Sequence, residues 1–200
     1  MTGQQSSASA RDRTPLAGGL QVLPDYLEPQ LDVIFVGINP GLASAAKRHH
    51  YAGKTNLFWP LLRESGFVPG HFDYENDSET PAHGVGLTNL VDRPSRGQDD
   101  LSRDELRAGA ATLRDKMTPL RAAVICFNGK AIYQAFAGGS CDFGLQPERF
   151  RGAAVFVMPS TSARAATYRR EDKLRFFREL KRLVEREAPR RETARPEARR

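Results

Sequence analysis

Asn39 is the first residue of the chain whose type and setting suggest chemistry. It lies in the sequence GINPG, where the apolar run at 32–37 ends. The two glycines and the proline make a rigid turn and let the backbone approach a ligand closely. The Asn39 amide can hold a water molecule or contact the edge of a base, but it cannot take up a proton as a carboxylate can. Taken alone, GINPG is more simply interpreted as an Asx-type turn after a strand.

A second group of polar and aromatic residues is the sequence HHY. Tyr51 could stack on a nucleic-acid base, a contact worth about 1–3 kcal/mol per base. His49 and His50 are adjacent, so they do not easily face one metal ion, and no third ligand follows them. We therefore expect no metal site and interpret the histidines as pocket-wall residues or phosphate contacts. Phe58 and Trp59 are expected in the hydrophobic core.

The third group is the sequence MPSTSAR at residues 158–164, which follows another apolar run. Small hydroxyl side chains and free backbone N–H groups can hold DNA phosphates, and Arg164 could reach into the base stack. Taken alone, this segment is more simply a Ser-rich loop that caps a helix.

Short apolar runs alternate with longer helical patterns, which predicts an α/β fold with a mainly parallel sheet. Continuous apolar runs predict buried strands at 32–37, 122–127 and 153–158, and residues 84–90 form a short strand or an extended loop. Helices are predicted at 57–65 with Pro60 in the first turn, at 101–117 with Ser102 and Glu105 as a capping box, at 130–136, and at 171–186.

In sheets of this kind, ligands bind beyond the carboxyl ends of the strands. The residues that follow Val36, Phe127 and Val157 are therefore expected to form the site. No Ser-His-Asp order, Walker A sequence, GxGxxG or EF-hand pattern is present. Their absence argues against nucleotide-binding and α/β-hydrolase classes.

The length of 200 residues indicates one domain. We expect a disordered N-terminal tail at 1–18, a single domain at 19–187 and a basic, flexible tail at 188–200. The formal net charge is +6, and residues 186–200 supply six Arg against three Glu, which is half of it. The charge therefore gives only weak support for a nucleic-acid partner.

Nothing in the sequence predicts secretion or membrane insertion. The N-terminus lacks the apolar stretch of a signal peptide, and no segment approaches the roughly 20 apolar residues that span a bilayer. The two cysteines, Cys126 and Cys141, lack metal-ligand spacing and are interpreted as reduced thiols, with Cys126 in the core. We expect a cytoplasmic protein, associated with the nucleoid if the source is bacterial.

Six motifs in one order resemble the mismatch-specific uracil/thymine-DNA glycosylases, a branch of the uracil-DNA glycosylase superfamily. They are GINPG, HHYAGKTNLFWPLLRESGF, GLTNLVDR, FNGKAIY, FGLQP and MPSTSARAATY. The resemblance covers about residues 31–184, and HHY and MPSTSAR resemble the thymine-DNA glycosylase side of the branch. It implies a three-layer αβα sandwich with a short, mainly parallel central sheet and no metal or cofactor. It also implies excision of uracil, above all opposite guanine, with thymine and modified pyrimidines as further substrates to test.

The resemblance also assigns roles to individual residues. Asn39 would position the attacking water, Tyr51 would stack on the flipped base, and Arg164 would fill the gap that the base leaves. The remaining positions are Gly37, Ile38, His50, Thr88 and Asn128 in or beside the base pocket, and Ser160, Thr161, Ser162 and Ala163 in the loop that enters the DNA.

Asp92 raises a separate hypothesis about the reaction. An asparagine can orient water without deprotonating it, whereas Asp92, which follows GLTNLV, could act as a general base if it reaches the water. The alternative is a salt bridge from Asp92 to Arg93 or Arg96. Backbone N–H groups around residues 38–41 could stabilise the charge that develops on the leaving base.

Three alternatives remain open. The first is a glycosylase that acts on uracil in any context, including single strands. The second is a DNA-binding module without catalysis, and the third is an α/β hydrolase of a small molecule such as a nucleoside. The favoured partner is double-stranded DNA with uracil or a mismatched pyrimidine, bound by a monomer and followed by abasic-site repair enzymes.

Overall fold

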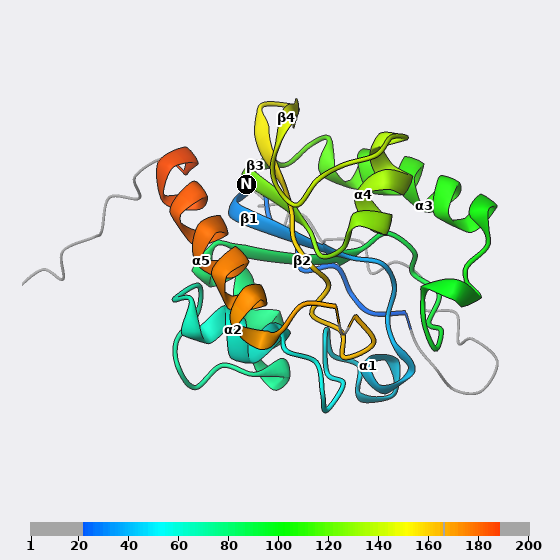
Figure 1. Cartoon of the computed structure of the whole chain (residues 1–200), viewed down its shortest axis with the longest axis horizontal. Coiled ribbons are helices and arrows are strands. Elements are labelled where there is room, and N and C mark those ends of the chain that lie inside the picture. Colours follow the sequence, from blue (N-terminus) through cyan, green and yellow to red (C-terminus); the bar gives the residue numbers. More distant parts are fainter. Residues whose placement is uncertain (1–21, 166, 189–200) are drawn as a thin grey trace, which may run out of the picture.

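The computed structural model describes residues 22–165 and 167–188. The predicted tails at 1–18 and 188–200 lie outside these residues, except for Ala188. At the centre is a five-stranded sheet in the order β2-β1-β3-β5-β4 (Figure 1). Its strands are β1 (Gln30–Gly37), β2 (Val85–Asn89), β3 (Arg121–Phe127), β4 (Gly144–Phe150) and β5 (Ala153–Val157).

The pairs β2–β1, β1–β3 and β3–β5 are parallel, and the pair β5–β4 is antiparallel. The predicted mainly parallel sheet is therefore confirmed. The central strands are buried on both faces because helices cover the two sides, which explains why their sequences are continuous apolar runs.

The helices are α1 (Leu42–Lys47), α2 (Phe58–Glu64), α3 (Arg103–Met117), α4 (Lys130–Ala137) and α5 (Arg170–Glu187), with 3₁₀ helices η1 (Tyr74–His83) and η2 (Gln98–Asp100). Figure 1 shows α2 and α5 on one side of the sheet and α3 and α4 on the other. Along β1, Val33 and Phe35 belong to the core under α2 and α5, whereas Ile34 and Val36 belong to the core under α3 and α4. Successive residues of a strand point to opposite faces of the sheet, so β1 contributes side chains to both cores.

Two features of the predicted helices at 101–117 and 171–186 are present in the structure. Ser102 accepts a hydrogen bond from the Glu105 N–H and Glu105 accepts one from the Ser102 N–H, so the predicted capping box is confirmed. The predicted apolar stripe of α5 is buried at Leu174, Phe177, Leu180 and Val184. Phe58, Trp59 and Cys126 are buried in the core, as predicted.

Candidate active site

A cavity of about 600 Å³ lies at the carboxyl ends of β1, β3 and β5. Four segments distant in sequence line it, at 37–44, 50–56, 95–99 and 160–165, together with Asn89 and Asn128. The topology therefore brings GINPG, Asn128 and the MPSTSAR loop, which follow β1, β3 and β5, to one place, and Tyr51 reaches it from the turn after α1. Within the described residues, no group of three or more His, Cys, Asp or Glu side chains is placed to hold a metal ion.

The Asn39 amide is fixed by two hydrogen bonds. Its Nδ2 donates to the carbonyl oxygen of Arg93 at 2.9 Å and to Oγ of Ser95 at 2.8 Å. The Ser95 hydroxyl uses its own hydrogen on the carbonyl of Gly97, at 2.7 Å, so it accepts from Asn39. Because a carbonyl oxygen only accepts, the NH₂ side of the amide must face Arg93. Both amide hydrogens are thus used inside the protein, and Oδ1 remains as an acceptor for a ligand.

Gly37 leaves room for two polar side chains at the cavity wall. A Cβ at this position would lie 2.5 Å from Oδ1 of Asn89 and 3.1 Å from the Tyr51 hydroxyl oxygen. Any larger residue would push these groups apart. Asn89 is 7% exposed, so its amide lies almost entirely inside the protein at the cavity wall.

Tyr51 presents its ring to the cavity from an unusual backbone conformation. Its φ is +54°, in the left-handed region. The ring stacks on buried Phe58 with centroids 3.8 Å apart and planes 15° apart, which leaves the opposite face for the cavity that Tyr51 lines. The hydroxyl is buried without a hydrogen-bond partner among the described residues, and burial raises the pKa of the Tyr51 phenol. The phenol is therefore neutral at physiological pH.

A buried carboxylate holds the turn that precedes Tyr51. Asp77, which is fully buried in η1, accepts a 2.7 Å hydrogen bond from the backbone N–H of His50 and lies 3.0 Å from Nδ1 of His49. The Trp59 indole donates to the carbonyl of His50 at 2.9 Å. These contacts join η1 and α2 to the turn, and they compensate for the strained backbone of Tyr51.

The His50 side chain lies in the wall of the cavity, as expected, and is 2% exposed. Its Nε2 is 2.8 Å from the carbonyl oxygen of Pro24, so Nε2 carries the hydrogen. Burial lowers the pKa of His50, with Pro24 and Asp77 acting in the opposite direction. The ring is therefore a neutral donor that joins the N-terminal segment to the site.

Asn128 anchors the start of the MPSTSAR loop. Its Nδ2 donates to Oγ1 of Thr161 at 2.9 Å, and its Oδ1 accepts from the Thr161 N–H at 3.0 Å. The Leu57 N–H donates to the carbonyl of Thr161 at 3.1 Å. The three contacts fix the loop at the cavity edge. Asn128 lines the cavity, but both ends of its amide are already bonded to Thr161 of the loop.

Arg164 crosses from this loop to the opposite side of the cavity. A Cβ at Gly97 would lie 2.6 Å from its Nη1, so the guanidinium rests directly on Gly97. Arg164 is exposed, and both residues line the cavity. The loop that carries the proposed DNA wedge therefore touches the segment that holds Asn39 through Ser95.

Two predicted site residues lie outside the cavity lining. Thr88 is fully buried, and its hydroxyl donates to Oδ1 of Asp25 at 2.6 Å. Successive strand residues point to opposite faces, so Thr88 faces Asp25 while Asn89 faces the cavity. The carboxylate of Asp92 is 3.1 Å from Nζ of Lys116, which also pairs with Asp25 at 2.9 Å.

The salt bridge of Asp92 is therefore made to Lys116, not to Arg93 or Arg96. Arg93 instead pairs with Glu105 at 2.6 Å. The structure does not bring Asp92 to Asn39, and the carboxylate that does line the cavity is that of exposed Asp99 at its rim.

Sequence reasoning missed Asn89, Ser95 and Asp77. Asn89 is adjacent to Thr88 in the motif GLTNL, and an alternation of strand faces would have singled it out. Ser95 and Asp77 act through contacts with residues 56 and 27 positions away, for which the sequence carries no periodic signal.

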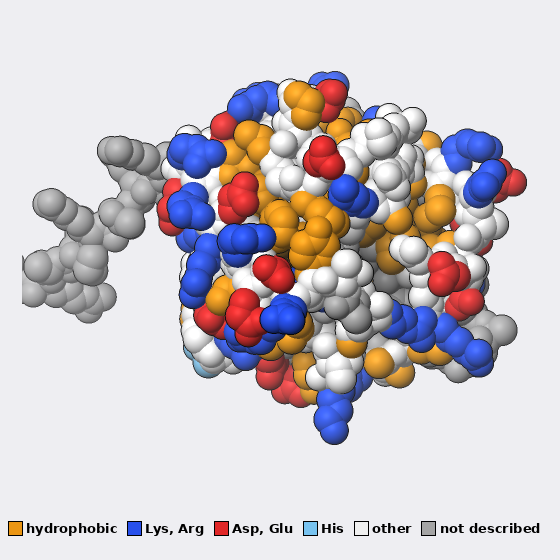
Figure 2. Space-filling model, in the orientation of Figure 1, with side chains coloured by type: hydrophobic (Ala, Val, Ile, Leu, Met, Phe, Trp, Pro, Cys, Tyr) orange, Lys and Arg blue, Asp and Glu red, His pale blue; other side chains and the backbone are white. Residues whose placement is uncertain are grey.

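The face of the molecule that carries α5 has no single sign of charge. Figure 2 shows Lys and Arg side chains over α5 interspersed with Asp and Glu, and a patch of hydrophobic side chains near the centre of this face. The rings of Phe143, Tyr168 and Phe176 contact one another, with centroids 5.2–6.1 Å apart. In the described part of the chain, no helix is long and apolar enough to cross a membrane.

The fold and cavity define an αβα protein with a cavity lined by several amide side chains and the ring of Tyr51. Residues 24–183 match the model of the uracil DNA glycosylase superfamily, and the chain belongs to this family.

A G/U mismatch-specific uracil DNA glycosylase of Schizosaccharomyces pombe is 42% identical over 165 residues, which are 77% of this chain and 51% of that protein. The chain thus spans about half the length of this relative. The solution structure of a putative uracil DNA glycosylase from Methanosarcina acetivorans is similar in fold, with a TM-score of 0.56 and 22% identity over 81% of this chain and 96% of that one.

Proposed function

We propose that the protein is a monofunctional DNA-repair glycosylase that flips uracil out of a duplex and hydrolyses its N-glycosidic bond, leaving an abasic site. The observation that carries the proposal is the Asn39 amide. Both of its hydrogens are held by the protein, and its acceptor oxygen is left for a ligand in a cavity walled by Tyr51. Membership of the superfamily and the name of the S. pombe relative support the same reaction.

In the proposed reaction, Oδ1 of Asn39 accepts a hydrogen bond from water and directs the water oxygen toward C1′ of the sugar. The new C1′–O bond forms as the C1′–N1 bond breaks, and the electron pair of the C1′–N1 bond leaves with the base. The water proton passes to solvent or to the departing uracil. Backbone N–H groups of residues 38–41 would stabilise the negative charge on the base.

The base itself would lie against Tyr51, the ring of which has one face on Phe58 and one toward the cavity. The Asn89 amide offers both a donor and an acceptor, which suits the imide edge of uracil. Gly37 leaves the space that both side chains occupy, because a Cβ there would lie within 3.1 Å of each.

Arg164 would enter the stack as the base leaves and would contact the orphan guanine. Extrusion costs a few kcal/mol and costs least for a mismatched pair, which favours uracil opposite guanine over uracil opposite adenine. The proposed partner is therefore mismatched double-stranded DNA, bound by a monomer in the cytoplasm. An enzyme that processes abasic sites would act next.

The test is single-turnover excision from labelled duplexes with G·U, A·U or G·T pairs and from single-stranded uracil, with the variant N39A in parallel. We expect release of uracil from G·U and a loss of at least about 100-fold in N39A, the size found when one preorganised polar group is removed from a catalytic site. Release of no base with duplex binding intact would favour the non-catalytic module. Equal rates on free nucleosides and on DNA would favour the small-molecule hydrolase.

A further inference from the structure

Lys173 is a buried lysine that the proposed reaction does not use. It lies in the first turn of α5 and is 3% exposed. Its Nζ donates to the carbonyl oxygens of Ala165 at 2.9 Å and of Ser162 at 3.4 Å. In the part of the chain that the structure describes, no carboxylate lies within 4.0 Å of this ammonium, although α5 carries several.

This position is unfavourable for a charged lysine on three grounds. Burial removes part of the water around the ammonium, which lowers the pKa of Lys173. No acidic partner compensates, and a cation in the first turn of a helix opposes the helix dipole. A neutral or apolar residue would fit the buried stripe of α5 more simply. The favourable contacts that remain are the two carbonyls, and both belong to the loop that carries Arg164.

The loop is anchored on both sides of Arg164. On the near side, Asn128 holds Thr161 through two hydrogen bonds. Arg164 itself lies in a turn from Ser162 to Ala165, in which the Ala165 N–H donates to the carbonyl of Ser162 at 3.1 Å. Lys173 binds the carbonyls at both ends of that turn, one before and one after Arg164, so it holds the turn itself, whereas Asn128 holds the residue that precedes the turn.

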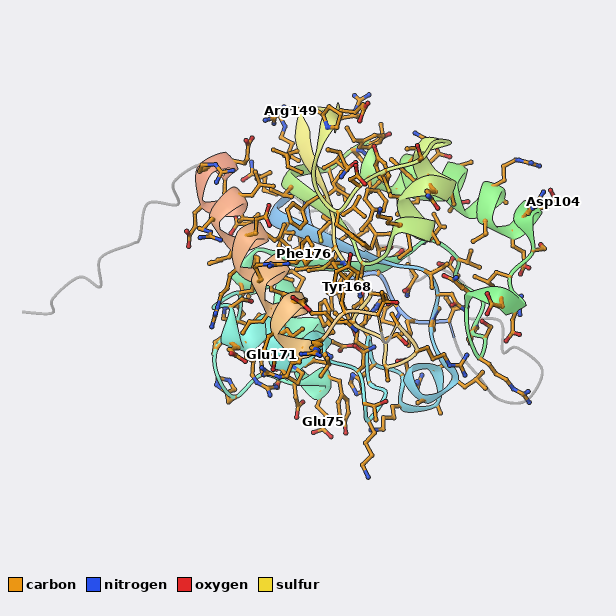
Figure 3. The ribbon with its side chains drawn as sticks, viewed as in Figure 1. Glu75, Asp104, Arg149, Tyr168, Glu171 and Phe176 are labelled. Atoms are coloured by element: carbon orange, nitrogen blue, oxygen red, sulfur yellow. The ribbon has the colours of Figure 1, made fainter. Side chains whose placement is uncertain are left out.

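The chain that leaves the loop is also held in place. Tyr168 contacts the rings of Phe143 and Phe176, and Figure 3 shows Tyr168 beside Phe176 where the chain returns to α5. The base of the loop is therefore fixed by packing, while the turn at its tip depends on Lys173. The side chain of Arg164 is the exposed part that this turn presents to the cavity mouth.

We propose that Lys173 is a positioning residue for DNA insertion: its ammonium binds the carbonyls of Ser162 and Ala165, and so holds the turn that presents Arg164. The inference rests on the proposed function and deepens it. Lys173 does not line the cavity, so it acts through Arg164 and not on the reacting atoms.

The experiment is a double-mutant cycle with K173M and R164A. K173M keeps the length of the side chain and removes the charge and the donors. Single-turnover excision is measured on the G·U duplex, base flipping is followed by 2-aminopurine next to the uracil, and duplex affinity is measured separately. K181M is the matched control, because Lys181 is on the same helix and, among the described residues, contacts exposed Glu185 and the Phe67 ring and not the loop.

We expect K173M to reduce flipping and excision by about tenfold, the effect of losing hydrogen bonds to a charged group, and to change duplex affinity by less than about threefold. The double variant should be no slower than R164A alone, because both changes remove the same insertion. K173R should recover part of the flipping signal, and K181M should match the wild type.

Independent, multiplicative losses in the double variant would overturn the proposal, as would a K173M protein that flips like the wild type. If K173M does not fold, K173Q retains two donors without the charge and is subject to the same cycle. If the wild type releases no base but flips it in a manner that depends on Lys173, the proposed reaction fails and the assignment of Lys173 stands. If the wild type excises uracil and K173M does so equally well, the reaction stands and the assignment fails.

Discussion

Replacement of Ser95 by alanine tests how the Asn39 amide is oriented. Ser95 accepts one of the two hydrogen bonds that fix this amide, at 2.8 Å, and the other goes to the carbonyl of Arg93 at 2.9 Å. In S95A the amide keeps one anchor and can rotate about it, so Oδ1 no longer has a single direction. A neutral hydrogen bond contributes about 0.5–1.5 kcal/mol, which corresponds to roughly 2- to 13-fold in rate.

The assay is single-turnover excision from the G·U duplex at saturating enzyme, where the rate reports the chemical and flipping steps without binding. S95A should lie between the wild type and N39A, and S95T should restore the rate because it keeps the hydroxyl. Ser95 is buried and also bonds Gly97, so the free energy of unfolding should fall by about 1–3 kcal/mol, which is checked by urea denaturation. A wild-type rate in S95A, or a loss confined to duplex affinity, would refute the reasoning.

Gly37, Asp92 and His50 give three further predictions. G37A should reduce excision at least tenfold and lower the free energy of unfolding by about 1–3 kcal/mol, because its Cβ would meet Asn89 at 2.5 Å; calorimetry and excision assays measure both. D92A should leave the single-turnover rate unchanged, since its carboxylate pairs with Lys116 outside the cavity, and a large loss would restore the general-base hypothesis. The unfolding free energy should fall as the pH falls below 6.5, because the folded state lowers the pKa of His50 and so binds fewer protons than the unfolded chain. Urea titrations at several pH values measure this, and in H50Q the unfolding free energy should depend less on pH.

The sequence was sufficient for the elements that bury continuous apolar surface. Strands at 32–37, 122–127 and 153–158 and the amphipathic helix at 171–186 were predicted within two residues of their observed ends. Strand β4 was not predicted, because GLQPERF is polar and contains a proline. It is an edge strand that pairs only with β5, with an irregular register between Leu145 and Arg149, so tertiary pairing forms it and not a pattern of its own.

The site was predictable to the same extent. GINPG and the loop with Arg164 meet because parallel strands end at one edge, which the order of elements already implies. Tyr51 lies between α1 and α2, and only its resemblance to the family's stacking aromatic pointed to the site. Which side chain of GLTNL faces inward depends on the register of β2, and the neighbour of Thr88 proved to be the one in the cavity wall. The supports of the site are pairs between distant segments, such as Asp77 with His50, and no local pattern indicates them.

The contact between Arg164 and Gly97 has a consequence for selectivity under the proposed function. One guanidinium cannot rest on Gly97 and fill a gap in a duplex, so the two positions compete for it. A complex with an intact, stacked duplex leaves the arginine where it is, whereas a complex with a flipped base must release it. The loss of that contact therefore raises the free energy of the flipped complex alone. A weakly paired base such as uracil opposite guanine, which costs less to extrude, can still flip where a Watson–Crick pair does not.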